Sequence, residues 1–157
     1  MEMKERAAES GRERRETELF GEEFKEEKKM ETPFKHGGFS WSELITKDVK
    51  AAKDFYTKLF GWETEDMSMP EGMTYTVIKV GGKGIGGIMK TPKEAKNLPP
   101  MWVTYVTVDD VDQIVKDAKK LGAKIHVEPR DIPDVGRFAV LIDPQGAAIN
   151  VITYKKM

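Results

Sequence analysis

The chain has 157 residues, of which 39% are hydrophobic and 34% are charged, and its formal net charge is −1. This length suits one domain of ordinary size, and the small net charge argues against a nucleic-acid partner bound by charge alone. The chain has no cysteine, which excludes disulfides, thiolate nucleophiles and zinc–thiolate sites. No apolar run reaches the ~18 residues of a membrane-spanning helix, and the acidic start is unlike a targeting peptide. We therefore expect a cytoplasmic protein without a membrane partner.

The first 33 residues form a charged N-terminal tail. Among residues 1–32, eight are Lys or Arg and eleven are Asp or Glu. Such a segment has too little apolar surface to offset the entropy of ordering it, although Glu and Lys three or four positions apart could support a transient helix. We expect residues 1–33 to be disordered or loosely helical, and a partner-binding arm is the alternative.

A first structural unit is predicted over residues 39–90. Phe39 to Thr46 alternates as a strand does, and Asp48 is placed to cap the following helix. That helix spans 49–60 with apolar residues at three- and four-residue spacing, and Gly61 supplies a left-handed cap. Three strands follow, separated by turns rich in Gly and Pro, and they cover residues 62–65, 75–80 and 84–89.

The second unit, residues 101–154, repeats this pattern. It follows a linker, Lys90 to Pro100, with three prolines and four charged residues. The segment starting at Val108 matches the one starting at Thr46, and the offset is 62 residues. Such self-similarity is typical of a duplicated structural module. The predicted elements are a strand over 101–108, a helix from 111 to 121 capped by Asp110, and strands over 124–127, 137–142 and 147–153.

Two consecutive βαβββ modules imply an α+β fold. One helix covers only one face of four strands, so neither module closes a core alone. We predict a domain over residues 34–157 whose two tandem modules, about 39–90 and 101–154, form one curved eight-stranded mixed sheet around a cup. The cup is the expected ligand site. Because one chain carries both modules, the protein could be a monomer or a homodimer.

A series of motifs resembles the vicinal oxygen chelate superfamily, which includes glyoxalase I, bleomycin-resistance proteins and extradiol dioxygenases. The resemblance covers about residues 39–154 and is greatest to glyoxalase-like proteins related to lactoylglutathione lyase. It implies the glyoxalase/bleomycin-resistance-like fold and lyase-related chemistry on a small molecule. The motifs that carry it are Asp48 with Phe55-Tyr56-x-x-Leu59-Phe60-Gly61-Trp62, Asp109-Asp110-Val111, Pro133-x-x-Gly136-Arg137-Phe138 and Asp143-Pro144-Gln145-Gly146-Ala147.

The resemblance also implies where a metal would be held. Metal-dependent members of the superfamily place His, Gln or Glu near the start of the first strand and within the last strand of each module. Here these positions hold Trp41, Val103, Asn150 and one of the residues 86–88, Gly-Gly-Ile. None of them is a good transition-metal ligand. We therefore predict no metal and no cofactor, and we do not expect metal-dependent glyoxalase I activity.

Glu43 is the candidate catalytic residue. It lies two positions after Trp41, so both side chains belong to one face of the strand. Burial in the cup would raise the pKa of Glu43 and suit it to act as a general base or as a partner for a ligand hydroxyl or amine. A structural ion pair with Arg130 or Arg137 is the alternative. Aromatic side chains suit a flat or apolar ligand, and the predicted ligand-binding set is Trp41, Tyr105, Asn150, Tyr75 and Phe138.

Three functions remain open from the sequence. The first is a small-molecule binding protein or metal-independent enzyme of unknown substrate, with the ligand held in the cup between the modules. We favour it because all four metal positions are apolar or amide. The second is a metal-dependent lyase, isomerase or dioxygenase, which would require a different strand register. The third is a non-catalytic structural or regulatory module.

Overall fold

The computed structural model describes residues 34–155, apart from the side chain of Glu94. The prediction for residues 1–33 lies outside this range. The first module contains β1 (Phe39–Thr46), α2 (Val49–Phe60), β2 (Glu63–Ser68), β3 (Thr74–Val80) and β4 (Lys83–Lys90). The second contains β5 (Met101–Thr107), α3 (Val111–Lys120), β6 (Lys124–Ile132), β7 (Gly136–Ile142) and β8 (Ala148–Tyr154). Short 3₁₀ turns occupy Pro70–Gly72 and Lys93–Ala95.

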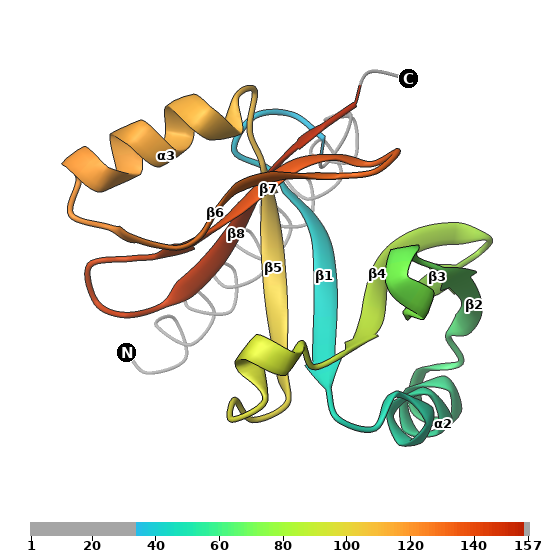
Figure 1. Cartoon of the computed structure of the whole chain (residues 1–157). Helices are drawn as coiled ribbons and strands as arrows, with labels where there is room; N and C mark the ends of the chain where they lie inside the picture. Colours follow the sequence, from blue (N-terminus) through green and yellow to red (C-terminus); the bar gives the residue numbers. More distant parts are fainter. Residues whose placement is uncertain (1–33, 156–157) are drawn as a thin grey trace, which may run out of the picture. The chain divides into compact units, whose positions relative to one another are not determined.

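The eight strands form one mixed sheet in the order β2-β3-β4-β1-β5-β8-β7-β6. In each module the first strand runs parallel to the last, β1 beside β4 and β5 beside β8, and the modules join where β1 and β5 pair antiparallel. Figure 1 shows β1 and β5 side by side between the two groups of outer strands. The predicted α+β fold with tandem βαβββ modules and one curved eight-stranded sheet is confirmed, and the sheet is not closed.

The helix boundaries follow from the predicted caps. The Asp48 carboxylate accepts a hydrogen bond from the amide of Ala51 at 2.9 Å. Asp110 does the same for Gln113 at 3.0 Å. Each bond provides an acceptor for an amide of the first helical turn, which has no acceptor within the helix itself. Gly61 ends α2 with φ 67°, a left-handed conformation that favours glycine.

Each module has its own small apolar core on the outer face of the sheet. In the second module, Val111 and Val115 of α3 pack with Val108, which follows β5, and with buried residues of the strands beneath, namely Ala139, Leu141 and Val151. In the first module the buried set is Leu44, Ile78 and Ile88, with Val49, Ala52, Tyr56 and Trp62 packed against it. Leu44, Val106 and Val108 therefore face the helices. The opposite face of β1 and β5 is left for the cup.

The edge strands differ most from the sequence prediction. β2 begins one residue later than predicted and continues to Ser68, and β6 continues to Ile132 instead of ending at Val127. Neither extension has alternating apolar residues. Both lie at the edges of the sheet, where backbone hydrogen bonds to one neighbouring strand hold the segment in place without a buried side-chain face. β6 even contains Pro129, beside a register shift between Val127 and Arg130, a position where proline costs no ladder bond. Neither helix within residues 34–155 has the length and apolar character needed to cross a membrane.

Candidate functional site

Glu43 lies near the middle of β1 on the cup face, and its side chain is buried, with 6% of the residue's surface exposed. Its neighbours across the sheet are Gly87 on β4 and Val103 on β5. Neither provides a charged partner. The carboxylate therefore depends on side chains that reach it from other positions.

Tyr75 reaches Glu43 from β3. Its hydroxyl donates to Glu43 Oε2 at 2.8 Å and accepts a bond from Trp41 Nε1 at 2.8 Å. The ring crosses over Gly87, where an added Cβ would lie 1.9 Å from the tyrosine hydroxyl. Only glycine at position 87 leaves room for this contact, which accounts for a glycine in the interior of a strand.

Tyr105 completes the pair of donors from β5. Its hydroxyl donates to Glu43 Oε1 at 3.1 Å and is hydrogen-bonded to the side chain of Asn150, the residue that faces it on β8. Tyr105 and Asn150 are both buried. Each carboxylate oxygen of Glu43 thus has one phenol donor, and each phenol has a second polar partner behind it.

Burial raises the pKa of Glu43, because the interior disfavours a negative charge, while the two tyrosine hydrogen bonds oppose the shift. Burial also raises the pKa of Tyr75 and of Tyr105, and the nearby Glu43 carboxylate adds to both shifts. The tyrosines therefore remain neutral donors. Among the described side chains no cation contacts Glu43. Its hydrogen-bond donors within residues 34–155 are neutral phenols.

The alternative of an ion pair between Glu43 and an arginine is wrong. Arg137 binds Asp112 through Nε and Nη2 and Asp131 through Nη1, on the outer face of the sheet. The guanidinium of Arg130 lies over the ring of Phe138, 5.2 Å from its centroid, an attractive cation–π geometry. Both guanidinium groups have partners of their own, so neither is available to Glu43.

Five of the six predicted site residues are brought into one hydrogen-bond network, which consists of Trp41, Glu43, Tyr75, Tyr105 and Asn150. Phe138 is separate from it. The ring belongs to β7, where position 138 faces Ile152 and position 140 faces Asn150, and its contact is with Arg130. Gly87 was missed as a contributor, although a glycine within a predicted strand was a usable signal.

The donor set of the cup does not fit a metal. Glu43 and Tyr105 occupy equivalent positions in the two modules. Glu43 pairs with Gly87 on β4 and Tyr105 pairs with Asn150 on β8, so Gly87 is the first-module counterpart of Asn150. The Tyr75 hydroxyl fills the space into which a ligating side chain at position 87 would project. Within residues 34–155 there is no group of three His, Asp or Glu side chains with metal-binding geometry, and His36 and His126 are exposed.

A family model described as the Glyoxalase/Bleomycin resistance protein/Dioxygenase superfamily matches residues 38–151. The chain belongs to this superfamily. Curated relatives include "Putative glyoxylase CFP32" of Mycobacterium tuberculosis, 38% identical over 120 residues that make up 75% of this chain and 46% of the relative. Another is "Anthracycline biosynthesis protein DnrV" of Streptomyces peucetius, 33% identical over 132 residues, 76% of this chain and 48% of the relative. The chain spans about half the length of these curated relatives.

Solved structures of the superfamily fold are similar at lower identity. Methylmalonyl-CoA epimerase from Mycobacterium tuberculosis superposes with a TM-score of 0.58 at 16% identity, covering 76% of this chain and 89% of that one. The hypothetical protein BH1468 from Bacillus halodurans gives a TM-score of 0.62 at 13% identity, covering 78% of this chain and 98% of that one. At such identities the likeness shows the fold alone.

Proposed function

We propose that the cup of this superfamily member binds a small organic molecule through Glu43 and that the chemistry of the site is proton exchange without a metal. The observation that carries the proposal is the buried Glu43 carboxylate, held between the hydroxyls of Tyr75 and Tyr105 with no counter-ion among the described side chains. Titratable groups with environments of this kind are concentrated at functional sites.

The chemistry follows from the environment of the carboxylate. As a carboxylate with a raised pKa, Glu43 is a stronger base than an exposed glutamate, and it can take a proton from a ligand hydroxyl, ammonium or acidified C–H. The proton then resides on a Glu43 oxygen, in the neutral form that burial favours. Returning it to the ligand restores the starting state, so the cycle needs no further reactant. A binder would use the same oxygens as hydrogen-bond acceptors.

The aromatic groups define which ligands fit. Trp41 and Tyr75 are partly exposed and cover a carboxylate that is itself buried. A ligand that reaches Glu43 must therefore contact these rings, which favours flat or apolar molecules. The names of the relatives suggest two groups of compounds for a first screen, glyoxylase substrates and anthracycline intermediates.

The test is a thermal-shift screen of metabolites on the full chain, repeated on Glu43→Gln and Trp41→Ala. A ligand of the cup should raise the melting temperature of the wild type and lose most of that shift in both variants. Glu63→Gln, at an exposed position of β2, is the matched control and should keep the full shift. A ligand whose shift is the same in Glu43→Gln as in the wild type would show that Glu43 does not bind it.

Metal dependence requires its own measurement. If the purified protein kept one equivalent of Ni, Zn, Fe or Mn through dialysis against a chelator, the metal-independent mechanism would be refuted. The expected result is less than a tenth of an equivalent, on the order expected for surface contamination, because the four family positions provide no adequate ligand set.

A structural role is the second candidate, and one observation favours it. Both Glu43 oxygens already have a donor, so the network could serve only to fix the orientation of β1, β3 and β5, as fully satisfied buried polar networks do in protein cores. The screen separates the two candidates. A structural network predicts variants with altered melting temperatures and no ligand whose shift depends on Glu43.

A further inference from the structure

A pocket lies at the end of the β1–β4 pair, away from the Glu43 network. Its lining residues are Lys47, Lys90, Thr91, Lys93 and Lys96, and its volume is about 440 Å³. The two parallel strands end together, with Thr46 beside Lys90 in the register and the Thr91 amide bonded to the Thr46 carbonyl at 2.9 Å. This pairing brings the residue after β1 next to the linker that follows β4.

Four of the five lining residues are lysines. Elsewhere in the described part of the chain, several lysines are neutralised by ion pairs with carboxylates, as for Lys50 with Asp54 and Lys53 with Asp66. No such pair with a described carboxylate involves any lysine of the pocket. Two acids adjoin the pocket lysines in the sequence, Asp48 after Lys47 and Glu94 after Lys93. Asp48 uses its carboxylate to cap α2 through the Ala51 amide. The pocket thus concentrates positive charge in a recess.

Thr91 adds a second, independent observation. Its hydroxyl oxygen is shielded from solvent and has no hydrogen-bond partner among the described atoms. An unsatisfied buried hydroxyl is destabilising, so a group that bonded to it from the pocket would recover part of the lost free energy. A bound anion would accept the hydroxyl proton.

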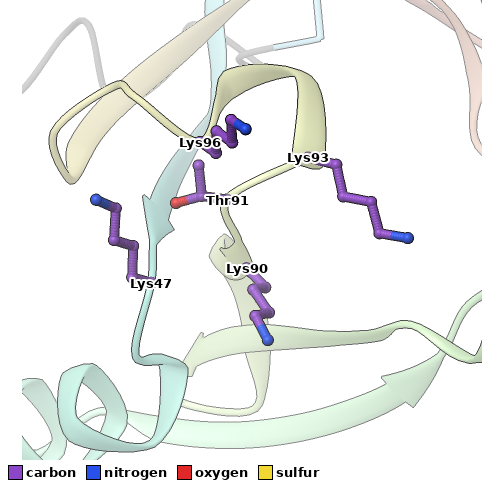
Figure 2. A pocket seen from close by; sticks show the side chains of 5 residues that line it. All are labelled: Lys47, Lys90, Thr91, Lys93 and Lys96. Atoms are coloured by element: carbon purple, nitrogen blue, oxygen red, sulfur yellow. The ribbon is translucent and has the colours of Figure 1, made fainter.

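Figure 2 shows how these groups are arranged around the pocket. Lys47 and Lys96 extend from opposite sides of Thr91, and the threonine hydroxyl points toward the side of Lys47. Lys90 and Lys93 extend away from it. Divergence of the ammonium groups is what like charges favour in water, and the flexible stems allow them to converge on an anion.

We propose that this pocket is an anion site for a ligand that carries a diphosphate group. Lysines act as point charges toward phosphate, and several of them around one recess suit a ligand with more than one negative charge. The volume of about 440 Å³ lies within the range of small-molecule sites, roughly 300–1,000 Å³. Lys47 follows Glu43 by four residues, or ~13 Å along a strand, so the site is distinct from the buried carboxylate and does not rest on the function proposed for it.

The experiment is calorimetric titration of the full chain with inorganic pyrophosphate at low ionic strength. Saturable one-to-one binding is expected in the wild type. In Lys47→Ala/Lys96→Ala the affinity should fall at least ~10-fold, because two of the four charges and one side of the recess are removed. The matched control is Lys116→Ala/Lys124→Ala, with the same change in net charge at exposed positions of the second module, and its affinity should stay within ~2-fold, since distant exposed charges are screened.

Thr91→Val distinguishes a built site from diffuse attraction. This variant should fold with equal or greater stability, since it removes an unsatisfied hydroxyl, and should bind pyrophosphate several-fold more weakly. Equal loss in the two double variants, unchanged affinity in Thr91→Val, or no saturable binding would each overturn the proposal. Adenosine diphosphate is the second probe. Tighter binding of it than of pyrophosphate would identify the diphosphate as part of a larger molecule, equal binding would identify the diphosphate alone, and either result supports the site.

Discussion

Replacing Glu43 by glutamine should change how the stability of the protein depends on pH. The pKa of Glu43 lies above its usual value of 4.5 in the folded state because of burial. A group whose pKa is raised on folding stabilises the native state fully below its unfolded pKa, and this contribution is lost as pH rises through the folded pKa. The wild type should therefore lose stability as the pH rises from about 4.5 toward neutrality, because Glu43 must ionise while buried. The Glu43→Gln variant has no carboxyl group at this position and should lack this pH dependence.

The magnitude follows from linkage and from the hydrogen bonds. Each unit by which the pKa is raised removes about 1.4 kcal/mol of unfolding free energy once the pH exceeds the folded value. Glutamine keeps an oxygen that can accept from one of the two phenols, and its amide must donate to the other, so one bond is rearranged at a cost of about 0.5–1.5 kcal/mol. Near pH 4, E43Q should be less stable by that amount. Near pH 8 the difference should shrink or reverse.

Urea unfolding of the wild type and E43Q, followed at a series of pH values from about 4 to 8, measures the change directly. Glu63→Gln, which also removes one carboxylate but at an exposed strand position, controls for the general effect of charge. The side-chain carboxyl of Glu43, assigned by ¹³C NMR with E43Q, gives the folded pKa. A stability difference that does not vary with pH, or a carboxyl pKa at or below the usual 4.5, would refute the argument that burial dominates over the two tyrosine bonds.

Three further predictions concern the same network and the helix caps. Gly87→Ala should destabilise the fold by about 1–3 kcal/mol, because its Cβ would lie 1.9 Å from the Tyr75 hydroxyl and 2.2 Å from the ring carbon that bears it. In a Tyr75→Ala background, which removes both the hydroxyl and the ring, the cost measured by urea unfolding should be smaller, and an equal cost would contradict the steric cause. Tyr75→Phe alone should raise the pKa of Glu43 further, since it removes a hydrogen bond that lowers it, and ¹³C titration showing a lower pKa would contradict this. Asp110→Ala should lower the unfolding free energy by about 1 kcal/mol, because the bond to the Gln113 amide is lost. Asp109→Ala, one residue before the cap, is the control. Equal losses in the two variants would argue against capping by Asp110.

The elements that the sequence predicts well are those whose signals are local. Asp48 and Gly61 lie within a few residues of the groups that they cap, so the ends of α2 can be located without knowledge of the fold. Strand parity is equally local, because side chains alternate along any strand. It correctly separated Leu44, which packs on the outer face, from Glu43, which is buried on the cup face. The duplicated pattern then extended the same reasoning to the second module.

The hydrogen bonds that Glu43 makes could not be predicted from local sequence patterns. Tyr75 comes from a strand that is not adjacent to β1 in the sheet, and its hydroxyl reaches the carboxylate only by crossing β4 above Gly87. Parity could place the tyrosine on a face, but contact across an intervening strand depends on twist and on the size of the residue between. The ion pair with an arginine was a reasonable alternative for the same reason, and sheet geometry excluded it by placing Arg137 beside Asp112.

By itself, then, the sequence determined the repeated βαβββ order, the faces of the central strands β1 and β5, and the lack of good metal ligands at the family positions, because these depend on residue type, spacing and alternation. Only the tertiary structure decided that Glu43 is bound by two neutral phenols and that Lys47 meets the lysines of the linker beyond β4. Both arrangements join residues far apart in the chain, as for Tyr75 and Trp41 with a separation of 34. Such contacts are set by strand order and register, and the local pattern of residue types in one sequence does not specify either of them.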